Sequence, residues 1–440
     1  MNRARLISAM AGLALAAAPL AAQNVAIRGG MVHTLAGPVI ENGTVVIQNG
    51  KITAVGGGPG GPAVSVPAGV SVVDAAGLHV YPGLFDAVTR LGLTEIGAVD
   101  VTADMQELGE FNPHLVAATA VHPASEHIPV TRANGVTHAV TAPQPRPAGI
   151  GGQATLIDLD GWTIEEMQVV PSVGFTLLWP RLAATGGFGG GGGGGGGAAT
   201  APRPFREIKK QYDEQVRRLD GWIDDARRYD AAIKAGERLP RDLKLEALAR
   251  ATRGELPLLI AVNTEREIRD AVAWAERQRV KIVILGGNEA YKVRTLLAEK
   301  HVPVILGPSQ EVPATDAGYD ERYAAAGLLK QAGVQFAIAT FNSEDSRTLP
   351  YEAGSTVSFG LPAEEALKAV TIYPAEILGV ADRVGTIEVG KLANIIVTDG
   401  DPLEIRTQVK HVVIAGRDVS LDNKHLQLYT RYRGRPKPRT

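Results

Sequence analysis

The central part of the chain alternates short, continuously apolar segments with amphipathic ones, and this alternation limits the available folds more than any other feature. Residues 256–262 are typical of a buried strand, and residues 264–278 have the spacing of an amphipathic helix. The same alternation continues through residues 280–285, 289–300 and 334–339. Strands that alternate with helices predict a parallel sheet, and about 300 residues of this pattern favour a closed (β/α)8 TIM-like barrel over an open sheet.

Both ends of the chain differ from this middle part because they are rich in short β-branched runs and turns. The run at residues 44–47 is followed by Asn49-Gly50, which is a strong signal for a β-hairpin. Residues 393–398 and 409–415 have the same character. We therefore expect an α/β protein with a small β-sandwich built from both termini. Its two parts are predicted at residues 23–81 and 381–440, on either side of a barrel at residues 82–380.

The first 22 residues have the three parts of a secretory signal peptide. Arg3 and Arg5 make the beginning positive, residues 6–20 are apolar, and Ala21-Ala22 form a small-residue cleavage site. The apolar run is shorter than the roughly 20 residues that a membrane span needs, and no later stretch is long and apolar enough. We expect a periplasmic or secreted protein with no integral membrane segment after the signal is removed.

Composition excludes several classes of protein. The chain of 440 residues has 45 Lys and Arg against 47 Asp and Glu, for a net charge of −2. A nucleic-acid partner is not expected, because such proteins usually carry a strong basic excess. The sequence has no Cys, which rules out disulfides and thiolate zinc sites.

Three further stretches stand apart in composition. The glycine-rich stretch at residues 186–197 lacks the Lys and Ser/Thr of a phosphate-binding loop, so we expect a loop without that function. Residues 205–252 are highly charged with apolar residues at helical spacing, which predicts a solvated helical pair laid over the barrel. The C-terminal tail is basic and is either a solvated end or a contact for an acidic partner surface. Its basic residues are Arg431, Arg433, Arg435, Lys437 and Arg439.

Four motifs resemble the amidohydrolase superfamily, particularly its imidazolonepropionase-like group. Residues 72–87, with Pro82-Gly83-Leu84 near their end, resemble the entry from the β-domain into the first barrel strand. Residues 364–375 resemble the last barrel helix, and residues 385–394 resemble the return to the β-domain. Residues 45–56 match the opening hairpin. These motifs frame nearly the whole mature chain.

The resemblance implies metal ligands at the ends of barrel strands, where His and Asp side chains hold a divalent ion that activates water. The family's His-x-His pair falls on Val88 and Arg90, and its other ligand positions fall on Ala261, Gly286 and Phe341. None of these side chains suits a divalent cation, and the Arg repels it. We therefore expect no metal and no cofactor. The histidines at positions 114, 122, 127 and 138 match no compact ligand motif.

Polar residues at the predicted strand ends are candidates for a ligand pocket, because these ends face the mouth of a barrel. The pocket candidates are Arg90, Glu95, Gln153, Asn263, Asn288, Asn342 and Arg347. Arg90 could hold a ligand carboxylate or pair internally with Glu95, and both interpretations remain open. Asp104 and Glu107 are candidates for a general acid or base, although their spacing also fits a solvated helix face. Trp162 is expected in the core.

Three hypotheses about function follow from these observations. The first is a non-catalytic amidohydrolase-like protein that is a subunit or partner of an active amidohydrolase paralogue, or that associates with itself. The second is a divergent hydrolase of C–N bonds in non-peptide or cyclic amides, since descent raises the expectation of hydrolysis without proving it. The third is a small-ligand binding protein that holds an anion at Arg90.

Overall fold

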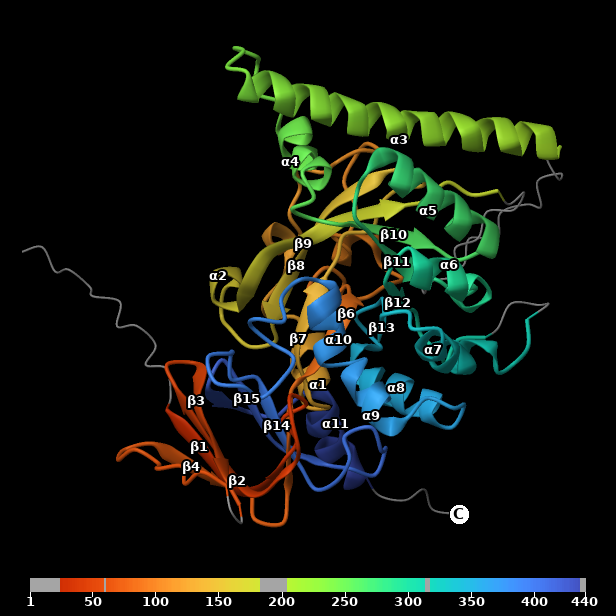
Figure 1. Ribbon diagram of the computed structural model, residues 1–440. Coiled ribbons are helices and arrows are strands. Elements are labelled where there is room, and N and C mark those ends of the chain that lie inside the picture. Colours follow the sequence, from red (N-terminus) through yellow and green to blue (C-terminus); the bar gives the residue numbers. More distant parts are fainter. Residues whose placement is uncertain (1–23, 59–60, 183–203, 313–316, 436–440) are drawn as a thin grey trace, which may run out of the picture.

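The computed structural model describes residues 24–58, 61–182, 204–312 and 317–435, and this part of the chain forms two sheets of eight strands each (Figure 1). One sheet is a nearly closed TIM-like barrel, and the other belongs to a separate β-sandwich domain. The fold class predicted from the sequence is confirmed.

The β-sandwich takes strands from both ends of the chain. β1 (Val25–Val32), β2 (Ile40–Gln48), β3 (Lys51–Gly57), β4 (Ser71–Asp74) and β5 (His79–Pro82) precede the barrel, and β14 (Ile395–Thr398), β15 (Val409–Ile414) and β16 (Arg417–Val419) follow it. The two groups meet where β14 pairs antiparallel with β5, which places Ile396 opposite Tyr81. The β2–β3 hairpin turns at Asn49 and Gly50, whose φ angles are 52° and 77°, as the Asn-Gly pair predicts.

The barrel strands are neighbours in space in the order of the sequence. They are β6 (Leu84–Thr89), β7 (Val136–Thr141), β8 (Ile150–Asp158), β9 (Gln168–Leu178), β10 (Leu258–Val262), β11 (Ile282–Gly286), β12 (Val304–Leu306) and β13 (Phe336–Ile338). The first and last strands meet where the backbone N–H of Phe341 donates to the carbonyl oxygen of Val88, at 2.8 Å. Apolar side chains such as Phe85, Leu259 and Ile305 fill the interior.

One strand departs from the predicted parallel sheet. β8 runs antiparallel to both neighbours, with His138 of β7 opposite Asp158 and Gly174 of β9 opposite Ala154. The connections on its two sides, residues 142–149 and 159–167, are shorter than the roughly dozen residues that a parallel crossover needs. β7, β8 and β9 therefore form a meander, and this part of the barrel is not built of βα units.

Helices lie around the barrel, and α5 to α9 follow one another along one side of it (Figure 1). The α-helices are α1 (His127–Arg132), α2 (Ile164–Met167), α3 (Phe205–Lys234), α4 (Leu243–Thr252), α5 (Glu265–Gln278), α6 (Arg294–Glu299), α7 (Glu321–Gln331), α8 (Leu349–Val357), α9 (Ala363–Lys368), α10 (Ile372–Ile377) and α11 (Lys424–Arg433). Four 3-10 helices span Asp100–Thr102, Ala117–Ala120, Ala290–Val293 and Ser346–Thr348.

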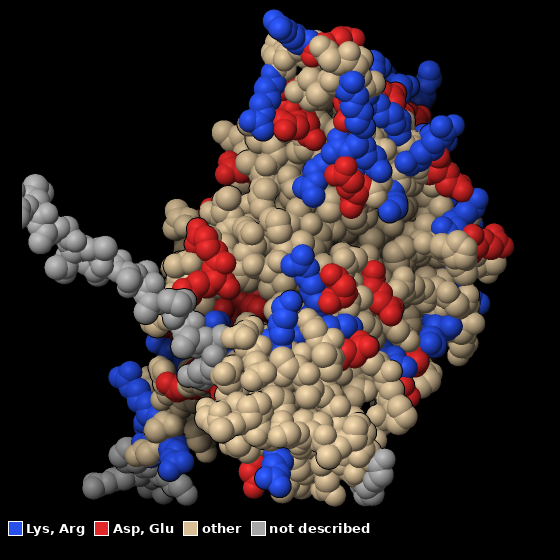
Figure 2. Space-filling view, turned by 60° about the vertical axis from the view of Figure 1, so that its left-hand side comes forward, with Lys and Arg blue, Asp and Glu red and all other residues tan. Residues whose placement is uncertain are grey.

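The predicted charged helical pair is present as α3 and α4, which lie over one end of the barrel (Figure 1). Basic and acidic side chains alternate over the top of the molecule in Figure 2, and Lys209 pairs with Asp213 one helical turn away. The buried face of α3 is fixed by Tyr212, whose hydroxyl accepts a hydrogen bond from Nε1 of Trp179 (3.0 Å) and donates one to Asp270 (2.8 Å). The helix is thus anchored to both β9 and α5.

Some sequence predictions concern residues outside the described part of the chain, and one is contradicted by the structure. The predicted signal peptide, the glycine-rich stretch at residues 186–197, and Lys437 and Arg439 of the tail lie outside the described residues. None of the described helices is long and apolar enough to cross a membrane. The prediction that Trp162 lies in the core is wrong: its side chain is 85% exposed, because it occupies the short turn between β8 and α2.

A buried polar junction joins the sandwich to the barrel. Asn394, just before β14, donates from Nδ2 to Oδ1 of Asp158 at 2.7 Å, and its Oδ1 accepts from the N–H of Ala415 at 2.9 Å. Burial raises the pKa of Asp158 to about 7 and lowers that of the adjacent His138 to about 3. The Asn394 amide therefore supplies hydrogen bonds to groups that water does not reach.

Replacing Asn394 by Ala should lower the free energy of unfolding by about 2 kcal/mol, because Asp158 and the Ala415 N–H would lose a buried partner. Urea unfolding followed by circular dichroism at pH 6 measures this change. Gln106→Ala, at an exposed position, is the matched control and should change stability by less than about 0.5 kcal/mol. An Asn394→Ala protein as stable as the control would contradict the role of this junction.

Candidate functional site

The mouth of the barrel, at the carboxyl ends of its parallel strands, is the place where TIM-like barrels carry their ligand sites. Thr89 and Arg90 reach it from the end of β6, and Asn263 follows β10. Residues 286–288 contribute at the end of β11, and residues 340–342 follow β13. Most of the candidates predicted from the sequence therefore belong to turns at this end.

Three of the five predicted ligand positions are apolar and pack onto the barrel interior. Val88 is 5% exposed and belongs to the buried cluster that fills the barrel, and Ala261 and Phe341 pack against the same cluster. Hydrocarbon side chains offer no lone pair to a metal ion. The floor of the mouth is thus a continuation of the apolar core at these positions.

At the fourth position, Gly286, a neighbouring side chain occupies the space that a side chain of residue 286 would need. Its φ of +84° is strained for any residue with a Cβ, and a Cβ built there would lie 2.6 Å from Oδ1 of Asn263. Asn263 Oδ1 also accepts the N–H of Asn288 at 3.4 Å, and the Asn263 carbonyl accepts the N–H of Glu289 at 2.9 Å. The predicted pocket residues Asn263 and Asn288 are therefore adjacent, and together they hold the β11 turn.

The fifth position, Arg90, carries a half-buried cation. Burial lowers the pKa of its guanidinium below the usual value, and no carboxylate acts against this shift. A guanidinium nevertheless stays protonated in proteins. The internal ion pair with Glu95 does not form among the described residues, and Glu95 Oε1 is itself buried without a hydrogen-bond partner. Arg90 thus places an uncompensated positive charge at the mouth.

A network of buried hydrogen bonds lies under the mouth and centres on Asp86, a residue that the sequence analysis did not single out. The N–H and hydroxyl of Thr340 both donate to the Asp86 carboxyl, the N–H at 3.1 Å. Thr89 Oγ1 donates to the carbonyl of Asn342 at 2.6 Å and lies 2.6 Å from Oγ of Ser346. Burial raises the pKa of Asp86 to about 7 despite these hydrogen bonds. The network links β6 to the chain that follows β13.

Several other candidates have their polar atoms engaged elsewhere. Asn342 Nδ2 donates to Asp345 at 2.8 Å, and the guanidinium of Arg347 donates to the carbonyl of Glu344, so both side chains hold the loop after β13. Gln153 is 6% exposed and bonds the carbonyl of Pro113 at 2.9 Å and Arg250 at 3.3 Å. These contacts give Gln153 a structural role rather than a place in the mouth.

The acidic loop after β6 does not form the helix that its spacing allowed. Asp104 and Glu107 are exposed in irregular chain, and Asp104 is held through its backbone N–H, which donates to the carbonyl of Leu93 at 2.7 Å. Since no helix forms there, the helix-face interpretation is wrong. Among the described residues no group of three or more His, Asp or Glu side chains lies close enough together to hold a metal ion. The side chains at the mouth do not match the donor set of the family's metal.

Comparison with known proteins identifies the class of this fold. The Amidohydrolase family profile matches residues 297–422. A solved amidohydrolase structure from Thermotoga maritima is 25% identical and superposes with a TM-score of 0.75, covering 90% of this chain and 99% of that one. These matches confirm the resemblance to the amidohydrolase superfamily, and to its imidazolonepropionase-like group, that the motifs indicated.

Curated relatives are longer than the shared region. The amidohydrolase tasK of Hapsidospora irregularis is 25% identical over 390 residues, which cover 85% of this chain and 39% of that protein. The imidazolonepropionase of Sphingopyxis alaskensis is 39% identical over 83 residues, which cover 18% of this chain and 20% of that enzyme. The chain thus matches less than half the length of these relatives. A molinate hydrolase structure (17% identical, TM-score 0.54, covering 91% of this chain and 96% of that one) shares the fold.

The raised pKa of Asp86 predicts how stability depends on pH. The folded state binds this proton more tightly than the unfolded state, so the contribution of Asp86 is full below about pH 4 and is lost as the pH rises through about 7. In Asp86→Asn the part of this loss that falls between pH 5 and pH 8, roughly 3 kcal/mol, should be absent, so the urea midpoint should fall less over this range than in the wild type.

Asp158 and His138 titrate in both proteins, so only the difference between their two pH profiles reports on Asp86. Parallel profiles for the wild type and Asp86→Asn would show that the buried carboxyl is ionised in the same way in the folded and unfolded states.

Proposed function

We propose that this chain is an exported, non-catalytic member of the amidohydrolase superfamily that serves as a subunit or partner of an active amidohydrolase. The proposal has three parts, which are the absence of the family's metal, association with another chain, and a periplasmic or secreted location. The signal-like composition of residues 1–22 supports the location.

The observation that carries the proposal is the substitution of the ligand positions at the mouth. Val88, Ala261 and Phe341 extend the apolar core, and the Asn263 amide fills the space in front of Gly286. Restoring one ligand would not rebuild a site, because a catalytic zinc needs about three protein ligands. The charge of Arg90 adds repulsion toward any divalent cation, and this repulsion is stronger in a half-buried position than in water.

The surface beside the mouth supports association with another chain. Ile96, Val101 and Leu108, which we call the rim loop residues, are 54%, 94% and 87% exposed. Contiguous exposed apolar patches mark interaction sites, and three exposed apolar residues on one loop are candidates for such a patch. A carboxylate from a partner would also give Arg90 the counter-charge that the described part of this chain does not supply.

A second candidate function is hydrolysis of C–N bonds in non-peptide or cyclic amides without the family's metal. It is favoured by the relatives, since the aligned proteins of Hapsidospora irregularis and Thermotoga maritima are named amidohydrolases. The groups available for such chemistry are the carboxylates of Glu95, Asp104 and Glu107. Cyclic-amide turnover by the isolated chain that is lost in Asp104→Asn or Glu107→Gln would favour this function over the first.

Metal content tests the first part of the proposal. The full chain, purified without chelator, should contain less than about 0.1 Zn, Fe or Mn ion per chain by plasma mass spectrometry, because the ligand positions offer no suitable donors. The double variant Val88→His/Arg90→His is the matched control and should still fail to hold an ion through dialysis. One tightly bound ion per wild-type chain, with hydrolysis that is lost on chelation, would reject the proposal.

Substitution in the rim loop tests the second part. Val101→Asp and Leu108→Asp should abolish association with a second chain, measured by light scattering of the tagged protein isolated from its own source, because they place charge in an apolar contact. Ile405→Asp is the control, since Ile405 is 73% exposed in the connection between β14 and β15, and it should leave association intact. Unchanged assemblies in the rim loop variants, or a partner that lacks the family's ligand set, would contradict the proposal.

A further inference from the structure

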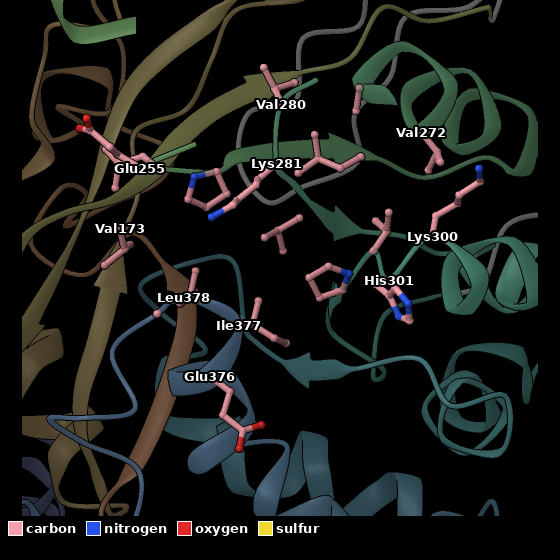
Figure 3. A pocket seen from close by; sticks show the side chains of 18 of the residues that line it. Val173, Glu255, Val272, Val280, Lys281, Lys300, His301, Glu376, Ile377 and Leu378 are labelled. Carbon is pink, nitrogen blue, oxygen red and sulfur yellow. The ribbon is translucent and has the colours of Figure 1, made fainter. Parts of the chain in front are cut away.

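A cavity of about 640 Å³ lies at the end of the barrel opposite the mouth. It is bounded by the amino-terminal ends of β9, β10, β11 and β12, by the carboxyl-terminal ends of α5 and α6, and by the end of α10 (Figure 3). This size is typical of small-molecule sites, whereas the amino-terminal face of a TIM-like barrel usually serves stability.

Apolar side chains form the floor of this cavity and continue into the barrel core, and charged side chains surround its opening. Val173, Val283, Leu378 and Val380 line it and also belong to the buried cluster inside the barrel. The remaining apolar lining includes Pro257, Val272, Val280, Val302, Pro303 and Ile377. An aliphatic group placed here would be removed from water on several sides, which favours binding by about 25 cal/mol per Å² of apolar surface buried.

The acidic groups that border the cavity already have partners. Glu276 pairs with Lys300 at 2.5 Å, Glu255 pairs with Arg253 at 2.5 Å, and Glu376 accepts a hydrogen bond from Gln335 at 3.0 Å. Figure 3 shows Glu255 and Glu376 pointing away from the centre of the cavity, and Lys300 extends toward α5, where Glu276 pairs with it. Glu276 and Glu255 are thus ion-paired, whereas Glu376 is bonded to a neutral amide and keeps its negative charge at the end of α10.

The basic groups Lys281, Arg279 and His301 also line the cavity, and in the described part of the chain their side chains form no ion pair or hydrogen bond. Lys281 runs along the wall toward Val173 in Figure 3. Ser172 lines the same cavity, is 6% exposed, and has a buried hydroxyl oxygen without a hydrogen-bond partner. The cavity therefore combines apolar walls with uncommitted cations and a buried hydroxyl.

We propose that this cavity is a binding site for a small amphipathic anion, in which an aliphatic chain lies against the valines and a carboxylate pairs with Lys281. The apolar walls exclude a fully polar anion, because its remaining hydration would be lost without replacement. The unpaired ammonium of Lys281 favours a ligand with a carboxylate over a ligand of the same chain length with a neutral or cationic head group. This site is separate from the mouth and does not depend on the proposed function.

Calorimetry with the full-length chain tests the site, with octanoate, 1-octanol and octylamine as probes. Octanoate should bind with one site per chain, octanol about tenfold more weakly, and octylamine not at all. Lys281→Met, which keeps the aliphatic stem, should weaken octanoate about tenfold and leave octanol unchanged. Lys424→Met is the matched control, since Lys424 is exposed on α11 and does not line the cavity, and it should stay within twofold of the wild type.

Each remaining outcome overturns the site. No octanoate binding up to millimolar concentration would mean that the cavity is closed or is filled by another segment of this chain. Equal affinity for octanoate and octanol would show that the cavity binds aliphatic chains without recognising the carboxylate. Equal losses in Lys281→Met and Lys424→Met would show a general charge effect. Thermal unfolding of both variants near the wild-type temperature verifies that they are folded, and none of these results bears on metal content or on association.

Discussion

The hydrogen bonds between β6 and the chain after β13 hold the first and last strands of the barrel together, and the chemistry of the mouth depends on them. Asp86 accepts two bonds from Thr340, and Thr89 reaches Asn342 and Ser346. These bonds fix the register of the closure, so that the Phe341 N–H meets the Val88 carbonyl. Val88 and Phe341 are thereby brought together on the apolar floor. In this chain the backbone and the side chains of Asp86, Thr89 and Thr340 connect the first barrel strand to the last.

Apolar side chains and a basic residue occur at both ends of the barrel, but they are arranged differently. At the mouth the apolar side chains are packed into the core, and Arg90 is a half-buried cation above them. At the opposite end similar side chains surround open space, and Lys281 is exposed at its edge. A buried charge without a partner is costly, whereas an exposed one is not. The mouth therefore carries the free-energy cost of a half-buried charge, whereas the opposite end offers open volume for a ligand.

Local patterns predicted much of the fold, and the errors occurred where contacts between distant residues decide the outcome. Periodicity and turn chemistry found the sandwich hairpin at Asn49-Gly50, the later barrel strands and the α3–α4 pair. The reversal of β8 was detectable in principle, because its flanking connections are short, but alternation alone does not give strand direction. The exposure of Trp162 depends on where a short turn lies, and a single buried Asp86 has no signal that distinguishes it from a surface acid.

The site was less predictable than the fold for the same reason. The resemblance predicted where five metal-ligand positions would fall, but the filling of the space at Gly286 by Asn263 depends on the pairing of β10 with β11. Likewise, the absence of the Arg90–Glu95 pair and the engagement of Gln153 with Pro113 and Arg250 depend on side-chain directions in three dimensions.

The reversed strand β8 has a consequence for the order in which the molecule assembles. Since no crossover helix of its own covers it, β8 is covered by segments from elsewhere: Phe111 and Val116 bridge to Ile150 and Gln153, and Arg250 of α4 reaches Gln153. The last of these lies about a hundred residues further along the chain. During synthesis the contact of β8 with α4 therefore cannot form until α4 has emerged, and pairings across such long separations make folding slow. The meander β7–β9 can thus pair its own strands early, but its packing is complete only once α4 is present.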